Sequence, residues 1–169
     1  NSYERLFTEA FIRPGLDPAR WGNRSNYAVL NVIPTGDSEM SIYHAVSGHR
    51  YTLRTDGFIS VRAGSTKGAL LTKALNFCGS ELVLNCSTSA AGSIKVEIQN
   101  PDGSPVAGFR LQDGTPFIGD RIEQIVAWKE SPDLGALAGK PVRLKFEMIE
   151  CDLYSFRFRP DPADGGTSQ

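Results

Sequence analysis

The stretch GKPVRLKFEMIECDLYSFRF, residues 139–158, decides the fold because it reads as two extended runs joined by a short polar step. In the first run, apolar and charged residues alternate from Val142 to Met148. In the second run, apolar and aromatic residues interleave with Ser155 and Arg157. A period of two is typical of strands that bury one face and leave the other in water. We therefore expect two strands that are connected at the IECD step, residues 149–152.

The rest of the chain from residue 50 onward shows the same alternation of apolar and polar residues. Short alternating runs are separated by turn residues at intervals of about ten, as in all-β sandwiches and barrels. We expect a hairpin around Asp56-Gly57 and a second one over residues 93–111, where alternation meets a Pro-Asp-Gly turn. Residues 121–130 are predicted to form a strand, and residues 131–140 a loop with a single helical turn.

The predicted fold class is all-β, a two-sheet antiparallel β-sandwich of the jelly-roll or concanavalin A-like type. Residues 50–159 would form this sandwich module, and residues 160–169 a polar tail with no means of packing. Residues 1–49 are richer in Asn, Pro and Arg and contain only two short strand-like runs, 27–34 and 39–46. This segment has too few apolar residues to form its own core, so we expect it to pack against the sandwich or against further chain.

Composition limits the classes of function. A chain of 169 residues, 40% hydrophobic and 22% charged, buries roughly 70% of its unfolded surface, which suffices for one core. Its net charge of −1 disfavours nucleic acid as a partner. No apolar run approaches the roughly 20 residues of a membrane span, so no membrane partner is expected. Since the start, NSYERLF, has neither an initiator Met nor a signal pattern, we expect an excised or processed piece.

Cysteine and histidine positions predict no metal site and no cofactor. Cys78, Cys86 and Cys151 show no CxxC spacing, whereas structural zinc takes four close-set N or S ligands. A Cys78–Cys86 disulfide is left open. A structural calcium ion near NPDG, residues 100–103, or QDG, residues 112–114, is also left open, because its oxygen ligands usually come from separated loops.

No catalytic residue is assigned from the sequence. Neither a GxSxG nucleophile elbow nor a GxxxxGK[ST] phosphate loop is present. Paired carboxylates for glycoside hydrolysis are harder to exclude, because sequence spacing alone does not reveal which acids meet. The candidate pairs are Asp37 with Glu39, Asp113 with Asp120, and Glu150 with Asp152. Turn capping is the simpler explanation for the second pair, and the third occupies the expected connection between two strands.

A carbohydrate site needs aromatic rings to stack on sugars and polar groups to bind hydroxyls. Such a mixture occurs in residues 21–43, and the candidate ligand-binding residues are Trp21, Asn26, Tyr27, Glu39 and Tyr43. The alternative is that these side chains only hold the N-terminal strands onto their neighbour.

The order of the runs from residue 51 to 158 resembles a known module. The segments YTLRTDGFISVRAG (51–64), LTKALNFCGSELVLNCSTSAAGSIKVEIQNPDGSPVAGF (71–109), GDRIEQIVAWK (119–129) and LGALAGKPVRLKFEMIECDLYSFRF (134–158) carry the likeness. Together they resemble the C-terminal β-sandwich module of bacterial invertase- and levanase-like proteins, the glycoside hydrolase family 32-like group. WGNRSNYAVLNVIPTGDSEMSIY, residues 21–43, looks like the end of the β-propeller that precedes this module and holds the catalytic acids. No segment matches the family's catalytic motifs, so no catalytic residue is carried over.

The resemblance implies a non-catalytic accessory module of a carbohydrate-active enzyme, whose partner would be a preceding catalytic β-propeller domain. Its role would be structural, with poly- or oligosaccharide binding through the five candidate residues as the hypothesis to test. We expect an extracytoplasmic or secreted location. One alternative is part of a glycoside hydrolase active site using Asp37 or Glu39; another is a purely structural, protein-binding sandwich. An exposed apolar patch in residues 1–49 would favour the latter.

Overall fold

The protein is an all-β chain, as expected, in a computed structural model that describes residues 8–13, 15–18, 22, 25–129, 131 and 133–160. Its described strands form two antiparallel sheets, but only one of them, a curled five-stranded sheet, lies in the region where a two-sheet sandwich was predicted. The chain divides into two compact units, Asn1–Thr55 and Asp56–Gln169, and each contains one sheet. The predicted tail, apart from Pro160, lies outside the described residues.

The N-terminal unit contains a three-stranded sheet in the order β1-β2-β3. Its strands are β1 (Ile33–Gly36), β2 (Glu39–Tyr43) and β3 (Arg50–Arg54). β2 runs antiparallel to both neighbours, and a bridge between Ala28 and His44 extends the pairing beyond the end of β2. Every residue of β1 is exposed, so this sheet buries little apolar surface.

The C-terminal unit contains a five-stranded sheet in the order β4-β8-β6-β7, with β5 also paired to β8. The elements are β4 (Val61–Ala63), β5 (Gly68–Leu71), β6 (Glu81–Gln99), β7 (Asp120–Ile125), the 3₁₀ helix η2 (Gly135–Leu137) and β8 (Arg143–Arg159). The predicted strand at 121–130 and the single helical turn within 131–140 are confirmed over the shorter spans of β7 and η2.

The predicted hairpin around Asp56-Gly57 is wrong. β3 pairs with β2 in the N-terminal sheet, whereas β4 pairs with β8 in the C-terminal sheet. Alternation shows that a segment is extended with one buried face, but it does not show which strand will be its neighbour. The turn predicted within 93–111 is present, since Asn100 N donates to Ser104 O at 2.8 Å, although the second arm contributes only isolated bridging contacts.

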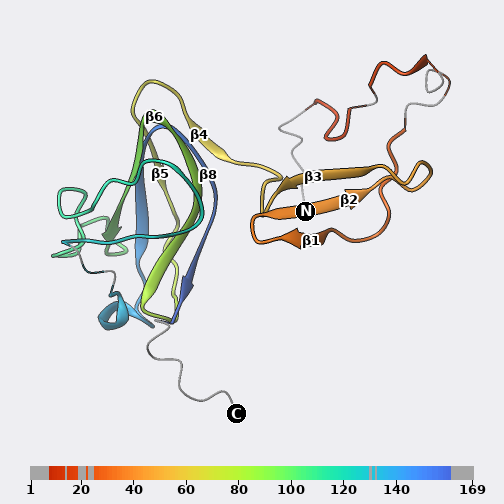
Figure 1. Ribbon diagram of the computed structural model, residues 1–169. Coiled ribbons are helices and arrows are strands. Elements are labelled where there is room, and N and C mark those ends of the chain that lie inside the picture. Colours follow the sequence, from red (N-terminus) through yellow and green to blue (C-terminus); the bar gives the residue numbers. More distant parts are fainter. Residues whose placement is uncertain are drawn as a thin grey trace, which may run out of the picture. The chain divides into compact units, whose positions relative to one another are not determined.

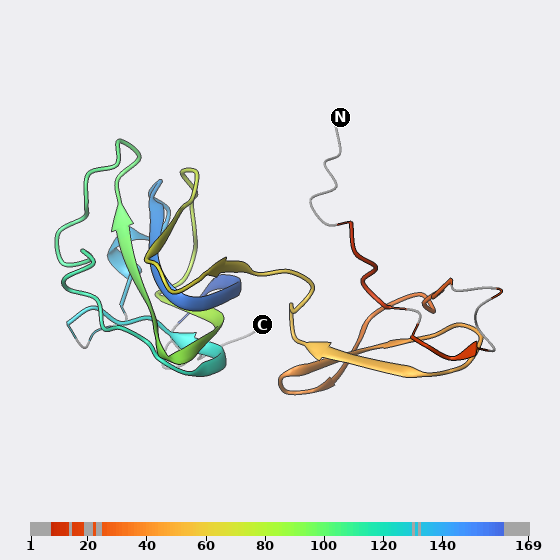
Figure 2. The ribbon, with the colours of Figure 1, turned by 90° about the horizontal axis from the view of Figure 1, so that it is seen from above.

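Two very long strands, β6 and β8, dominate the C-terminal unit and pair from Glu81↔Arg159 to Gln99↔Arg143 (Figure 1). The two strands predicted over 139–158 are therefore one strand, and the IECD step is a bend within it. At this bend Glu150 has a positive φ of 41°. On one side of the bend Thr88 of β6 pairs with Cys151 of β8, and on the other side Ser93 pairs with Ile149. Residues 89–92 of β6 therefore lie opposite Glu150 alone. The sheet consequently curls strongly, as the view from above shows (Figure 2).

The curled sheet encloses one hydrophobic core. Leu82 and Leu84 come from the half of β6 before the bend, and Val96 and Ile98 from the half after it, yet all four belong to the same buried cluster. Trp128 joins this cluster, and its indole Nε1 donates a hydrogen bond to Val96 O at 2.8 Å. The halves of each long strand thus pack on each other across the bend, which removes their apolar residues from water.

The cysteines differ in accessibility, and no disulfide joins them. Cys78 is exposed, whereas Cys86 and Cys151 are buried in the core. Burial, assisted by the nearby charge of Asp152, raises the pKa of the Cys151 thiol to about 11, so this thiol stays protonated at neutral pH.

We therefore predict that one thiol per chain reacts rapidly with Ellman's reagent at pH 8 in the native state, and three react in guanidinium chloride. The rapid reaction should disappear in Cys78→Ser. A second rapidly reacting thiol in the native wild-type protein would contradict the buried positions of Cys86 and Cys151.

Candidate functional site

One face of the N-terminal sheet gathers polar and aromatic side chains, and we call it the tyrosine face: Tyr27, Thr35, Glu39, Ser41, Tyr43 and Arg50. Alternation along β2 places Glu39, Ser41 and Tyr43 on the same side. The bridge at Ala28↔His44 sets Val29 opposite Tyr43, with Val29 N donating to Tyr43 O at 2.8 Å. Tyr27, two residues earlier, then lies diagonally from Tyr43 on the same side. The Tyr27 side chain is 66% exposed, so its ring is accessible.

A hydrogen-bond network fixes the polar part of this face. The Arg50 guanidinium on β3 donates to Ser41 Oγ at 2.8 Å and to Thr35 Oγ1 at 3.1 Å, and it forms an ion pair with Glu39. The Thr35 hydroxyl in turn donates to Glu39 Oε1 at 3.0 Å. The Arg50 and Glu39 side chains remain 45% and 40% exposed, so both can still meet a ligand. The carboxylate and guanidinium are therefore held in place at the surface.

The register places Tyr27 next to Tyr43 at one end of the tyrosine face, whereas Glu39 lies at the other end of β2, roughly 13 Å along the strand from Tyr43. Asn26 has a local role, because its side-chain amide donates to Ile12 O at 2.6 Å and so anchors the chain just before Tyr27. Trp21 lies outside the described residues. The sequence analysis missed Arg50. Its charge is opposite to that of Glu39, but this indicates a contact only when β2 and β3 are known to be neighbours.

The opposite face of this sheet is apolar and partly covered. Ile42, Tyr51 and Leu53 point to that side, where Phe11 and Ile12 complete a pocket of about 270 Å³. The two faces of the sheet thus differ in chemistry: the tyrosine face carries the hydrogen-bond network, together with the exposed side chains of Val29 and Ile33, which lie opposite Tyr43 and Ser41.

A second candidate site lies at the bend of the C-terminal sheet, and we call it the bend pocket. It has a volume of about 340 Å³, and its polar lining includes Arg62, Ser65, Ser87, Thr88, Ser89, Glu150 and Asp152. The acid pair Glu150 and Asp152 therefore lines one pocket. Both carboxylates already accept hydrogen bonds, Glu150 from the Ser89 hydroxyl and Asp152 from the Ser60 hydroxyl at 2.7 Å.

The other acid pairs have structural roles or remain separate. Asp113 forms an ion pair with Lys129 at 3.2 Å, and this contact lowers the pKa of the Asp113 carboxyl below its ordinary value. Asp37 lies in the turn between β1 and β2 and takes no part in the hydrogen-bond network of Arg50 and Glu39.

Within the described ranges, no three side chains of His, Cys, Asp or Glu come together as a metal-binding group. Among the same residues, no helix has the length and apolar character needed to cross a membrane.

The fold and the two sites define an all-β protein whose polar sites are a sheet face and a pocket at a sheet bend. Comparison with protein-family models, with curated proteins and with solved structures gives no match to this chain.

The bend of the C-terminal sheet depends on Gly92, which gives a test of its geometry. A Cβ at this position would lie 2.5 Å from Glu150 O and 2.6 Å from Ile149 O, both backbone atoms of β8. We predict that Gly92→Ala lowers the free energy of unfolding by about 1–3 kcal/mol, because β6 and β8 must separate locally. Urea denaturation followed by tryptophan fluorescence measures this change.

Gly64→Ala is the matched control. Gly64 lines the bend pocket, but a Cβ there meets nothing within 4 Å. Its free energy of unfolding should stay within about 0.5 kcal/mol of wild type. Equal stability of Gly92→Ala and Gly64→Ala would show that the close approach at the bend is absent.

Proposed function

We propose that this chain is a non-catalytic β-module that binds carbohydrate, as an accessory part of a carbohydrate-active enzyme. The observation that carries the proposal is the tyrosine face, where the exposed Tyr27 ring lies next to Tyr43 at one end and the ion pair of Glu39 with Arg50 lies further along the same face. Tyr27 offers a flat apolar surface for the C–H face of a sugar ring. Glu39 accepts hydrogen bonds from hydroxyl groups, and Arg50 donates them.

Preorganisation supports the same proposal. Binding a sugar costs free energy when side chains must be ordered, and this cost falls when they are already held. Three strands supply the members of the network, since Thr35 comes from β1, Glu39 and Ser41 from β2, and Arg50 from β3. A ligand would therefore meet polar groups whose positions the sheet already sets.

The finer expectations belong to this proposal as well. A jelly-roll-like sandwich is supported by the bend, because the halves of β6 on either side of it pack in one core. The proposed partner is a preceding catalytic β-propeller, as in the invertase- and levanase-like proteins that the sequence resembles, and the proposed location is extracytoplasmic.

Protein binding is a second candidate, favoured by the exposed apolar side chains of the N-terminal unit. Val29, Leu30, Val32 and Ile33 are 50%, 87%, 37% and 48% exposed, and they follow one another along the chain up to β1. Monomeric proteins rarely expose such apolar groups contiguously, so this edge suits contact with another protein domain. It is compatible with the accessory role, in which the partner domain covers apolar surface.

The hydrolase alternative, with Asp37 or Glu39 acting on a glycosidic bond, has less support. A general acid gains its reactivity in a dry pocket, whereas the Glu39 side chain is 40% exposed and paired with Arg50. Loss of turnover in Glu39→Gln with an intact fold would nevertheless establish this alternative.

We predict that a thermal-shift screen against fructans, arabinans, xylans and β-glucans finds a ligand, and that Tyr27→Ala weakens its binding by roughly 10-fold or more. Loss of one stacked ring is expected to cost about 1–2 kcal/mol of binding free energy. Isothermal titration calorimetry measures the affinity. Phe58→Ala, which removes an exposed aromatic ring from the C-terminal unit, should bind as wild type.

Two results would count against the proposal. If no polysaccharide raises the melting temperature, protein binding becomes the better candidate. If Tyr27→Ala and Phe58→Ala both bind as wild type, carbohydrate binding takes place away from the tyrosine face.

A further inference from the structure

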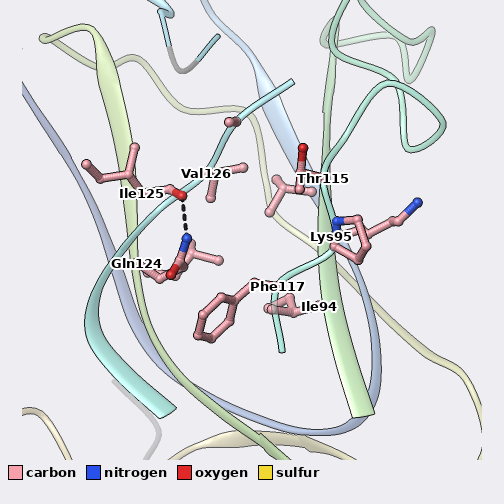
Figure 3. A pocket seen from close by; sticks show the side chains of 11 residues that line it. Ile94, Lys95, Thr115, Phe117, Gln124, Ile125 and Val126 are labelled. Atoms are coloured by element: carbon pink, nitrogen blue, oxygen red, sulfur yellow. Dashed lines mark hydrogen bonds between the residues drawn. The ribbon is translucent and has the colours of Figure 1, made fainter. Parts of the chain in front are cut away.

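A pocket of about 240 Å³ opens on the inner side of the curled sheet in the C-terminal unit, and we call it the β7 pocket (Figure 3). Its apolar wall includes Leu84, Ile94 and Val96 of β6, each no more than 1% exposed. Phe117 and Val126 complete the apolar part of the lining, whereas the register places the Ile125 side chain on the opposite face of β7, with Glu123. The pocket is independent of the tyrosine face, which belongs to the N-terminal unit.

Backbone pairing holds the walls of the β7 pocket apart. β7 pairs with the half of β6 before the bend, while Phe117 pairs with Ile94 in the half after it. Thr115 N donates to Ala127 O at 3.1 Å and links these two walls. Because three sets of backbone hydrogen bonds fix this ring of chain, the side chains cannot simply collapse into the space. The pocket is therefore a property of the topology.

The size and lining of the β7 pocket favour an apolar guest over water. Protein cores leave few voids larger than a water molecule. An engineered apolar cavity of about 150 Å³ stays dry and binds benzene, so 240 Å³ has room for a larger ring system. Water in such a space needs two to four polar partners, which the aliphatic and aromatic part of the lining does not provide.

Two polar groups at the β7 pocket are available to a guest. The amide nitrogen of Gln124 donates to Ile125 O at 2.7 Å, but within the described chain no donor reaches its Oε1 atom. The Thr115 hydroxyl likewise has no side-chain hydrogen bond to any described residue. Lys95 extends away from the pocket, and its ammonium group lies 3.4 Å from Leu111 O. The pocket thus combines an apolar body with one or two uncharged acceptors.

We propose that the β7 pocket binds a small, flat, uncharged aromatic molecule with a single N–H or O–H donor, of the size of a bicyclic ring. The ring system would lie against Phe117 and the aliphatic wall, and its donor would bond to Gln124 Oε1 or to the Thr115 hydroxyl. An apolar pocket with a few placed polar groups is the usual form of a small-molecule site. Charged ligands are disfavoured, because Lys95, the charged residue of the lining, extends away from the pocket and would not offset their desolvation.

Indole and indene test the proposal, because they have nearly the same shape and only indole has an N–H donor. Titrations of the full chain, followed by methyl NMR, should shift the signals of Ile94, Val96 and Val126. Indole should bind about 3–10-fold more tightly than indene, the contribution expected of one hydrogen bond. In the double variant Thr115→Val with Gln124→Met, this ratio should fall to about one while indene still binds.

Ala127→Leu is designed to fill the β7 pocket, which Ala127 lines, and should abolish binding of both probes. Circular dichroism and the wild-type pattern of the remaining methyl signals report whether this variant is folded. No methyl shift with either probe at its solubility limit would overturn the proposal, as would undiminished binding to folded Ala127→Leu. If Ala127→Leu does not fold, the double variant decides. An indole-to-indene affinity ratio unchanged from wild type would overturn the proposed hydrogen bond from the ligand to Gln124 or Thr115.

Discussion

The C-terminal unit depends on the pairing of β6 with β8 over nearly their entire lengths. Each of the other strands attaches to one of these two, β4 and β5 to β8 and β7 to β6. Because the two long strands bend at the same place, the sheet turns back on itself and buries the apolar faces of both halves in one core. The bend is possible because β6 has four residues opposite Glu150 and because Gly92 leaves room for the carbonyl groups of β8. The bend pocket and the β7 pocket are consequences of this geometry.

Much of this unit could be predicted from the sequence, because alternation reports burial of one face. The apolar positions from Val142 to Met148 and from Ile94 to Ile98 are buried as expected. The continuity of β8 was missed, since a polar step such as IECD looks the same in a bend as in a connection between two strands. Glu150 keeps the strand intact by adopting a positive φ, which is uncommon for a residue other than glycine and has no clear sequence signal.

Three residues of the tyrosine face were among the ligand-binding candidates that the sequence offered. Tyr27, Glu39 and Tyr43 were recognised because aromatic and polar residue types are close together in the sequence. Their arrangement on one face depends on the register of β2 with its neighbours, which no local pattern specifies. Arg50 was missed for the same reason: it was assigned with β3 to the C-terminal module, so its ion pair with Glu39 was not foreseen.

The N-terminal sheet combines stability and recognition in the same contacts. Its strands are short and β1 is wholly exposed, so apolar burial contributes little to holding β1 in place. Bonds from Arg50 on β3 to Thr35 on β1 and Ser41 on β2 join all three strands across the face that we propose binds sugar. Since the Ser41 side chain is fully buried, the lower part of this network is shielded from water, where hydrogen bonds are stronger. The outer part, formed by Glu39 and Arg50, stays accessible, so a sugar hydroxyl could add to a network that the sheet already requires without breaking it.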